Sequence, residues 1–377
     1  MITTYVVVSA LYPPAFATFF NALLVYFHLT ANTWTGIGGG VAAILIVGYM
    51  NHNNIKLSSM VIGVLMVLEA TFVAALALVI VVKGGHLGHF SAAPFNPGAA
   101  TFGFSGLSLA AIFAFLSIAG VDGIAPVAEE SRTPRRLIPL ATILITLIAG
   151  LYWALTSYGF AIAVPVHTVE SYVSAGQITP VLPIARSYIG GWAVLVPITG
   201  FTAALASFGA SLYAASRITY AISREGFLTK YFTGLHPKFR TPWRAEAATL
   251  IVSLVFLVVV SLWQGGPSNA YAYLGEVFVF FVLVLYIFVN LANLVYHWRF
   301  RRDTFNWFLN GFIPVAGIVI DGYIMYKGFF VSEISLPFKT GSSIVWISLG
   351  WALLGIAWAW WWSRRRRLSS ISLSAEV

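Results

Sequence analysis

Long apolar stretches alternate with short polar segments along the whole chain. A helix needs about 20 mostly apolar residues to cross the hydrocarbon core of a bilayer. Ten stretches meet or approach this length, at residues 5–28, 34–50, 58–82, 107–128, 137–163, 188–222, 246–263, 274–298, 309–330 and 342–362. Because a segment in lipid must satisfy its own backbone hydrogen bonds, each is predicted to be a helix. The pattern predicts an all-α polytopic membrane protein of about ten transmembrane helices, in one domain covering residues 1–377.

Two connections between the stretches are long, at residues 83–106 and 164–187, and both are rich in Gly, Pro, Ser and Thr. We interpret them as loops on one side of the membrane. The longest connection on the other side, about residues 223–245, is too short for an independent hydrophobic core. No soluble domain is therefore expected.

Composition supports this interpretation. The 377 residues are 59% hydrophobic and 9% charged, whereas an ordinary soluble domain has roughly 25% charged residues. The chain has no cysteine, which excludes disulfides, thiolate metal sites and cysteine nucleophiles.

The basic residues lie mainly on one side of the predicted membrane. Seventeen of the 21 Lys and Arg fall in alternate connections, namely Lys56, Arg132, Arg135, Arg136, Arg217, Arg224, Lys230, Lys238, Arg240, Arg244, Arg299, Arg301, Arg302 and Arg364–Arg367. Since loops rich in Lys and Arg stay in the cytoplasm, the chain is predicted to be a multi-pass protein of the cell membrane with both termini cytoplasmic.

The net charge of +9 has a second possible meaning, a nucleic-acid surface. The basic residues are spread between apolar runs, so we expect no nucleic-acid partner. The basic tail at residues 363–377 is predicted to contact anionic membrane lipid instead.

Motifs of enzymes are not found in the sequence. It has no phosphate-binding loop ending in Gly-Lys-Ser/Thr, no Gly-x-Ser-x-Gly elbow and no His-Glu-x-x-His helix. His86 and His89 are two neutral ligands without a carboxylate close in sequence, which is a weak metal site. We therefore expect no enzyme, cofactor or metal site, and a secondary transporter, a channel and a structural membrane protein remain open.

Ionisable residues inside apolar runs indicate function because an isolated charge is costly in a membrane. Four acids qualify, Glu69, Asp122, Glu276 and Asp321. Glu276 is at the start of its run, so its carboxyl group is expected near the membrane edge. Glu69 and Asp122 have no basic partner three or four residues away and are the stronger candidates.

The fourth run contains Gly120, Gly123 and Pro126 within seven residues. Gly and Pro each weaken a helix, so this run is predicted to break near mid-membrane. A broken helix exposes carbonyl groups that bind charged substrate groups in transporters. The alternative is a simple proline kink.

The residues around this break resemble a known family, the amino acid permeases of the amino acid-polyamine-organocation superfamily. Three groups of residues carry the resemblance. They are Phe115, Gly120, Asp122, Glu129, Glu130, Pro134, Arg136 and Pro139; then Ala215–Arg217, Tyr220, Arg224–Gly226, His236–Lys238, Thr241 and Pro242; and, less specifically, Tyr286, Asn290, Arg299, Phe305, Asn306 and Pro314.

The resemblance implies a transporter fold of two inverted five-helix repeats followed by two further helices. Residues 1–83 resemble helices 3–5 of the family, residues 107–298 helices 6–10, and residues 309–362 helices 11 and 12. On this alignment the family's first two helices are missing, and we expect a mis-assigned start codon or a truncated gene. The competing interpretation is a truncated, non-transporting membrane protein or scaffold subunit.

The resemblance also implies a site and a substrate. The implied substrate-binding residues are Leu116, Ser117, Ile118, Ala119, Gly120 and Asn21, and the implied proton-coupling residues are Asp122 and Glu69. Carbonyls of residues 116–120 would hold a substrate amine, and Leu116 stands where relatives often have an aromatic gate. Glu69 stands where some relatives have a Lys that substitutes for sodium. An acid cannot act as that fixed cation, but a buried acid is a candidate proton carrier, so a proton is the expected coupling ion rather than sodium. The expected function is proton-coupled amino acid transport, with polyamine or other organocation transport as an alternative. The individual substrate, symport or exchange, and the oligomeric state stay open.

Overall fold

The computed structural model describes residues 2–53, 55–96, 98, 103–118, 120, 133–174, 179–239, 241–330 and 343–365, which are mostly helical and form no strand. Twelve α-helices follow one another in these ranges: α1 Ile2–Tyr26, α2 Thr33–Asn53, α3 Ile55–Val82, α4 Gly103–Ile118, α5 Pro134–Ala163, α6 Val166–Ser174, α7 Val181–Ile189, α8 Leu195–Arg224, α9 Trp243–Gln264, α10 Pro267–Phe300, α11 Ile313–Met325 and α12 Ser343–Arg365. The chain is an all-α polytopic membrane protein, as the apolar pattern predicts.

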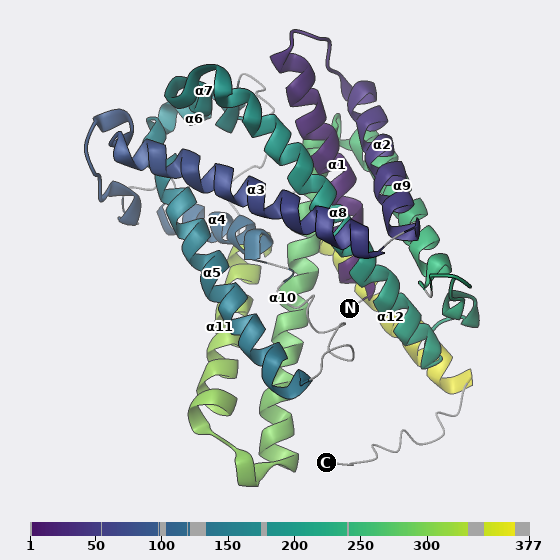
Figure 1. Ribbon diagram of the computed structural model, residues 1–377. Helices are drawn as coiled ribbons and strands as arrows, with labels where there is room; N and C mark the ends of the chain where they lie inside the picture. The colour runs from purple at the N-terminus through teal and green to yellow at the C-terminus, as the bar shows by residue number, and fades with distance from the viewer. Residues whose placement is uncertain are drawn as a thin grey trace.

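Helix α1 is at the centre of the bundle. It packs against α2, α8, α9 and α10, while α3 packs across α8 and α5. Helices α10 and α11 run side by side (Figure 1). The α1, α8 and α10 group therefore forms the scaffold on which the shorter helices are placed.

Eight of the described segments are long and apolar enough to cross a membrane. They are Thr4–Tyr26, Thr33–Asn51, Met60–Leu87, Arg136–Ala163, Val181–Arg224, Trp243–Gln264, Pro267–Phe300 and Trp307–Phe330. The other two predicted spans correspond to α4, which has 16 residues, and to α12, whose apolar part is Ile344–Trp358.

The predicted loop at residues 164–187 contains two helices instead, α6 and α7. Helix α7 buries Ile184 and Ala185 in a cluster with Leu76 and Ile80 of α3. Apolar residues at helical spacing therefore anchor a segment whose Gly, Ser and Thr content suggests a loop. The other predicted loop, residues 83–106, contains short 3₁₀ turns, and α4 already begins at Gly103.

Helix α10 begins earlier than its apolar run, at Pro267 rather than residue 274. A proline fits the first turn of a helix because its missing N–H would have no partner there. The polar residues Ser268 and Asn269 lower the hydropathy of these first turns and hide the start of the helix. Glu276 consequently lies more than two turns after the start of the helix, and its expected position near the membrane edge stays a prediction.

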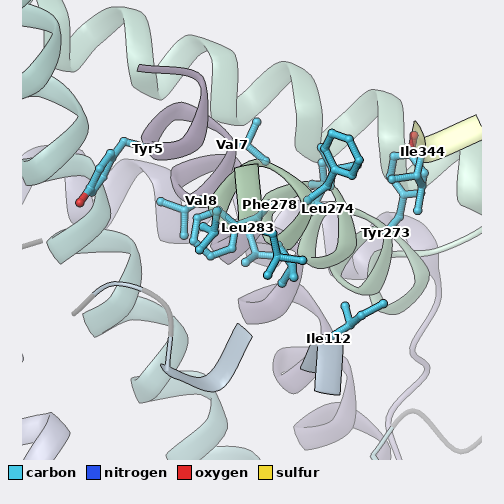
Figure 2. Packing of buried hydrophobic residues seen from close by; sticks show 14 of the residues in the cluster. Tyr5, Val7, Val8, Ile112, Tyr273, Leu274, Phe278, Leu283 and Ile344 are labelled. Carbon is cyan, nitrogen blue, oxygen red and sulfur yellow. The ribbon is translucent and has the colours of Figure 1, made fainter. Parts of the chain in front are cut away.

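The main hydrophobic cluster surrounds the first half of α10. Side chains of α1, α4, α8 and α12 meet it there, among them Val8, Ile112, Ala215 and Ile344. Figure 2 shows Leu274, Phe278 and Leu283 of α10 inside this cluster, with Tyr273 close to Ile344. This packing fixes the helices that border the predicted site.

Candidate functional site

The end of α4 agrees with the predicted break in the fourth apolar run. The helix ends at Ile118, and Gly120 has a φ of +106°, a conformation that residues with a side chain rarely adopt. Of the predicted site residues, Ala119 and Asp122 lie outside the described residues, as do Glu129 and Glu130. The described part of the predicted break therefore comprises Leu116, Ser117, Ile118 and Gly120.

Leu116 points from the end of α4 towards α1 and α10. A Cβ atom added to Gly275 of α10 would lie 3.0 Å from Leu116 Cδ2 and 3.8 Å from Leu11 Cδ1 of α1. Gly275 thus provides the space in which three helices approach one another, and Leu11 there is fully buried. This convergence is the central geometric feature of the candidate site.

Helix α1 carries two prolines just beyond this point, Pro13 and Pro14. Proline has no N–H, so the carbonyls of Ser9 and Ala10, four residues earlier, lose their usual helical donors. Ser9 and Ala10 are fully buried. Such carbonyls are suitable acceptors for an ammonium group, and nothing in the sequence reasoning had identified them.

Tyr12, which follows Leu11 on α1, belongs to a group of hydroxyls from three helices. The Tyr12 hydroxyl shares a hydrogen bond with Ser207 of α8 and lies near the phenol of Tyr271 of α10. Three helices that are distant in sequence thus place polar atoms together inside an apolar bundle. The sequence gives no signal for this group, because none of the three residues is ionised at neutral pH.

Ser117 points away from this convergence. Its backbone carbonyl accepts a hydrogen bond of 3.1 Å from Trp153 Nε1 of α5, and its hydroxyl donates to the Phe113 carbonyl at 3.0 Å. Trp153 therefore ties the end of α4 to α5. The Ser117 carbonyl, which is one of the predicted substrate ligands, already accepts one hydrogen bond.

Glu69 lies on α3 opposite α5. Its Oε2 atom is buried and has no hydrogen-bond partner, and Tyr152 of α5 is close enough to interact with its charge. Since Tyr152 precedes Trp153, α5 connects Glu69 with the carbonyl of Ser117. Glu69 and Ser117 thus both lie against α5, at two consecutive residues of that helix.

Asn21 lies ten residues beyond Leu11 on α1, or about 15 Å along the helix. Its amide nitrogen donates to the Asn32 carbonyl at 2.9 Å, and its amide oxygen accepts from the Thr35 hydroxyl at 2.9 Å. These bonds hold the connection between α1 and α2. The structure does not bring Asn21 to Leu116, and its substrate contact stays a prediction.

Buried acids occur elsewhere in the bundle. Glu276 of α10 is 3% exposed, Asp321 of α11 is 5% exposed and Glu246 of α9 is 6% exposed. The Oε1 atoms of Glu276 and Glu246 are buried and without a hydrogen-bond partner, as are the side-chain hydroxyl of Tyr273 and both amide atoms of Gln264. Glu246 is the first residue of its predicted run, so sequence reasoning did not count it as a membrane acid.

No group of three or more His, Asp or Glu within the described part of the chain is arranged to hold a metal ion. The polar features described above can accept protons or ammonium groups.

Comparison with known proteins shows extensive similarity to transporters. The family described as amino acid permease matches residues 1–369. The chain is 24% identical over 360 residues to the methylthioribose transporter of Bacillus subtilis, covering 92% of this chain and 72% of that protein. It is 30% identical over 243 residues to the human cationic amino acid transporter 4, covering 63% of this chain and 35% of that protein. It is 27% identical over 215 residues to the low-affinity putrescine importer PlaP of Escherichia coli K12, covering 55% of this chain and 44% of that protein. Against the last two, the chain spans less than half the length of the relative.

Proposed function

Because the chain belongs to the amino acid permease family, which matches it over residues 1–369, we propose that it is a secondary transporter of an amino acid in the cell membrane. Transporters named for an amino acid class, a diamine and a thiosugar are among its relatives. All three names describe the membrane transport of a small polar solute. The orientation in this proposal has both termini in the cytoplasm, as the distribution of Lys and Arg predicts.

One observation carries the proposal, the convergence of α1, α4 and α10 at Leu11, Leu116 and Gly275. Close to it, α4 ends at Ile118, and α1, which stays helical from Ile2 to Tyr26, lacks two backbone N–H donors at Pro13 and Pro14. Interrupted helices supply the polar backbone groups that bind a charged substrate within a membrane. We place the substrate amine at this convergence, near the carbonyls of Ser9 and Ala10 and those of residues 116–120 other than Ser117, whose carbonyl accepts from Trp153.

The experiment that tests this placement uses purified protein reconstituted in liposomes. Gly275→Leu fills the space between Leu116 and Leu11, so we expect uptake of labelled amino acid to fall about tenfold or more, because overpacking displaces neighbouring side chains. The control is Gly322→Leu on α11, where no atom lies within 4 Å of an added Cβ. It should transport at close to the unmodified rate.

Equal uptake by the Gly275 and Gly322 variants would overturn the placement of the site. No saturable uptake or binding of any amino acid or diamine by the unmodified protein would overturn the transport function itself. Size-exclusion profiles of both variants distinguish loss of function from loss of fold.

Proton coupling through Glu69 is the second part of the proposal. Glu69 has a buried, unpartnered oxygen, and it is linked through Tyr152 and Trp153 of α5 to the carbonyl of Ser117. A half-buried carboxyl with one buried oxygen that has no hydrogen-bond partner is suited to bind and release a proton, because ionisation there is costly. Asp122 follows the end of α4 and is proposed to act with it.

Uptake measured across a range of external pH tests this coupling. Acidification should increase uptake by the unmodified protein, whereas Glu69→Gln and Asp122→Asn should each flatten this response. Glu225→Gln is the matched control, since Glu225 is exposed at the end of α8. An unchanged pH response in both test variants would reject proton coupling through these acids, and dependence on sodium would identify the alternative ion.

A diamine or other organocation is the second candidate substrate. The observation that favours it is the buried carboxyl of Glu276, one residue from Gly275, whose Oε1 atom has no partner. A buried carboxylate requires a compensating cation, and a second ammonium group would supply one. Competition for uptake between a neutral amino acid, a cationic amino acid and putrescine decides between the two classes.

A further inference from the structure

The second half of α10 ends in an open groove on the surface of the bundle. The groove has a volume of about 620 Å³ and is lined by Leu294, Val295, Trp298, Arg299 and Arg302. The first four of these positions recur at helical spacing, so they form one stripe along the helix. Arg302 continues the stripe just beyond the end of α10 at Phe300.

The chemistry of the stripe changes along its length. It begins with two aliphatic side chains, continues with an indole and ends with two guanidinium groups, over about 12 Å of helix. Val295 is 45% exposed and Trp298 is 55% exposed. Aliphatic residues suit the hydrocarbon core, Trp the interface and Arg the headgroup region of a membrane.

The two arginines that line the groove contact aromatic side chains of the same segment. Arg302 Nε donates a 2.9 Å hydrogen bond to the Trp298 carbonyl, and its guanidinium carbon lies 5.4 Å from the centre of the Trp298 ring. The guanidinium carbon of Arg299 lies 5.7 Å from the Phe300 ring. Guanidinium groups bind phosphate oxygens through paired hydrogen bonds.

Arg301 stands between them and differs in its surroundings. It does not line the groove. Its side chain is hydrogen-bonded to Tyr296 and lies near the carboxylate of Asp303. The segment therefore contains two arginines directed to the groove and one with its own phenol and acid partners.

We propose that this groove is a binding site for an anionic phospholipid, whose phosphate contacts Arg299 and Arg302 and whose acyl chain lies along Leu294, Val295 and Trp298. Charge complementarity selects an anionic headgroup, and the exposed Val295 with the half-buried Leu294 selects a lipid over a soluble phosphate. The inference depends on the chain being in a membrane and is independent of the transported substrate.

Thermal unfolding of the detergent-solubilised full chain tests the proposal. Phosphatidylglycerol at about ten times its dissociation constant should raise the unfolding temperature by roughly 2–4 °C. Phosphatidylcholine of the same chain length and inorganic phosphate should each give no shift. The Arg299→Gln, Arg302→Gln double variant should lose the shift, and the matched control Arg301→Gln should keep it.

An equal shift with phosphatidylcholine would overturn the role of the headgroup charge, and an equal loss in Arg301→Gln would overturn the assignment to this groove. A shift with inorganic phosphate alone would replace the lipid by a soluble anion. If the double variant does not fold, phosphatidylglycerol with brominated acyl chains decides. It should quench the fluorescence component that Trp298→Phe removes, more than brominated phosphatidylcholine does, and equal quenching would contradict the proposal.

Discussion

The two halves of α10 are similar in composition and opposite in environment. In the first half, Ala270, Leu274, Val279 and Leu283 are at most 1% exposed. In the second half, Phe288 is 63% exposed and Val289 is 55% exposed. Figure 2 shows the first half surrounded by side chains of other helices, whereas the second half packs mainly against α11 and the turns around it.

This difference shows that hydropathy in a membrane protein reports depth in the membrane and not packing. Lipid chains are as apolar as leucine, so a side chain that faces lipid and one that faces protein have the same pattern. The halves differ in what particular residues contact. The first half has Gly275, which allows α4 to approach, and the buried carboxyl of Glu276.

The largest expected difference between the halves concerns stability. Phe278→Ala removes a side chain that is 4% exposed within the main cluster and should lower the free energy of unfolding by about 3–5 kcal/mol, because it leaves a cavity. Phe288→Ala, the same substitution ten residues later, should change it by less than about 0.5 kcal/mol. Unfolding of detergent-solubilised protein measures both. Equal losses would mean that the second half is covered by protein.

A smaller loss of unfolding free energy is expected where α11 covers the second half of α10. A Cβ atom on Gly317 would lie 2.7 Å from Asn290 Nδ2 of α10. Gly317→Leu should therefore cost about 1 kcal/mol, since the Asn290 side chain has to move. Gly322→Leu on the same helix, with no atom within 4 Å, is the control in the same unfolding measurement. An equal cost in both would indicate an effect of helix propensity and not of the contact.

Much of the fold follows from the sequence, because crossing a membrane requires long apolar helices. The ten predicted spans correspond to eight long segments and to α4 and α12. Helices α6 and α7 are not predicted, since each has only nine residues, fewer than the about 20 on which the search for spans relies. The start of α10 is missed because proline and polar residues open it.

The candidate site is less predictable. The end of α4 follows from its glycines, and Glu69 follows from its charge in an apolar run. The contacts between Leu116, Leu11 and Gly275, and between Tyr12 and Ser207, join residues far apart in sequence. Such contacts depend on how whole helices pack, which local periodicity does not specify. The prediction for Asp122 lies outside the described residues and remains a prediction.

The paired prolines of α1 have a mechanical consequence. A helix resists bending because its backbone hydrogen bonds stretch, and at Ser9 and Ala10 two consecutive bonds of this kind are missing. Flexing α1 at this level costs less than it would elsewhere along the helix. Because α1 packs against α2, α8, α9 and α10, a small change in its angle displaces four helices at once. The centre of the bundle thus has a built-in hinge at the depth of the candidate site.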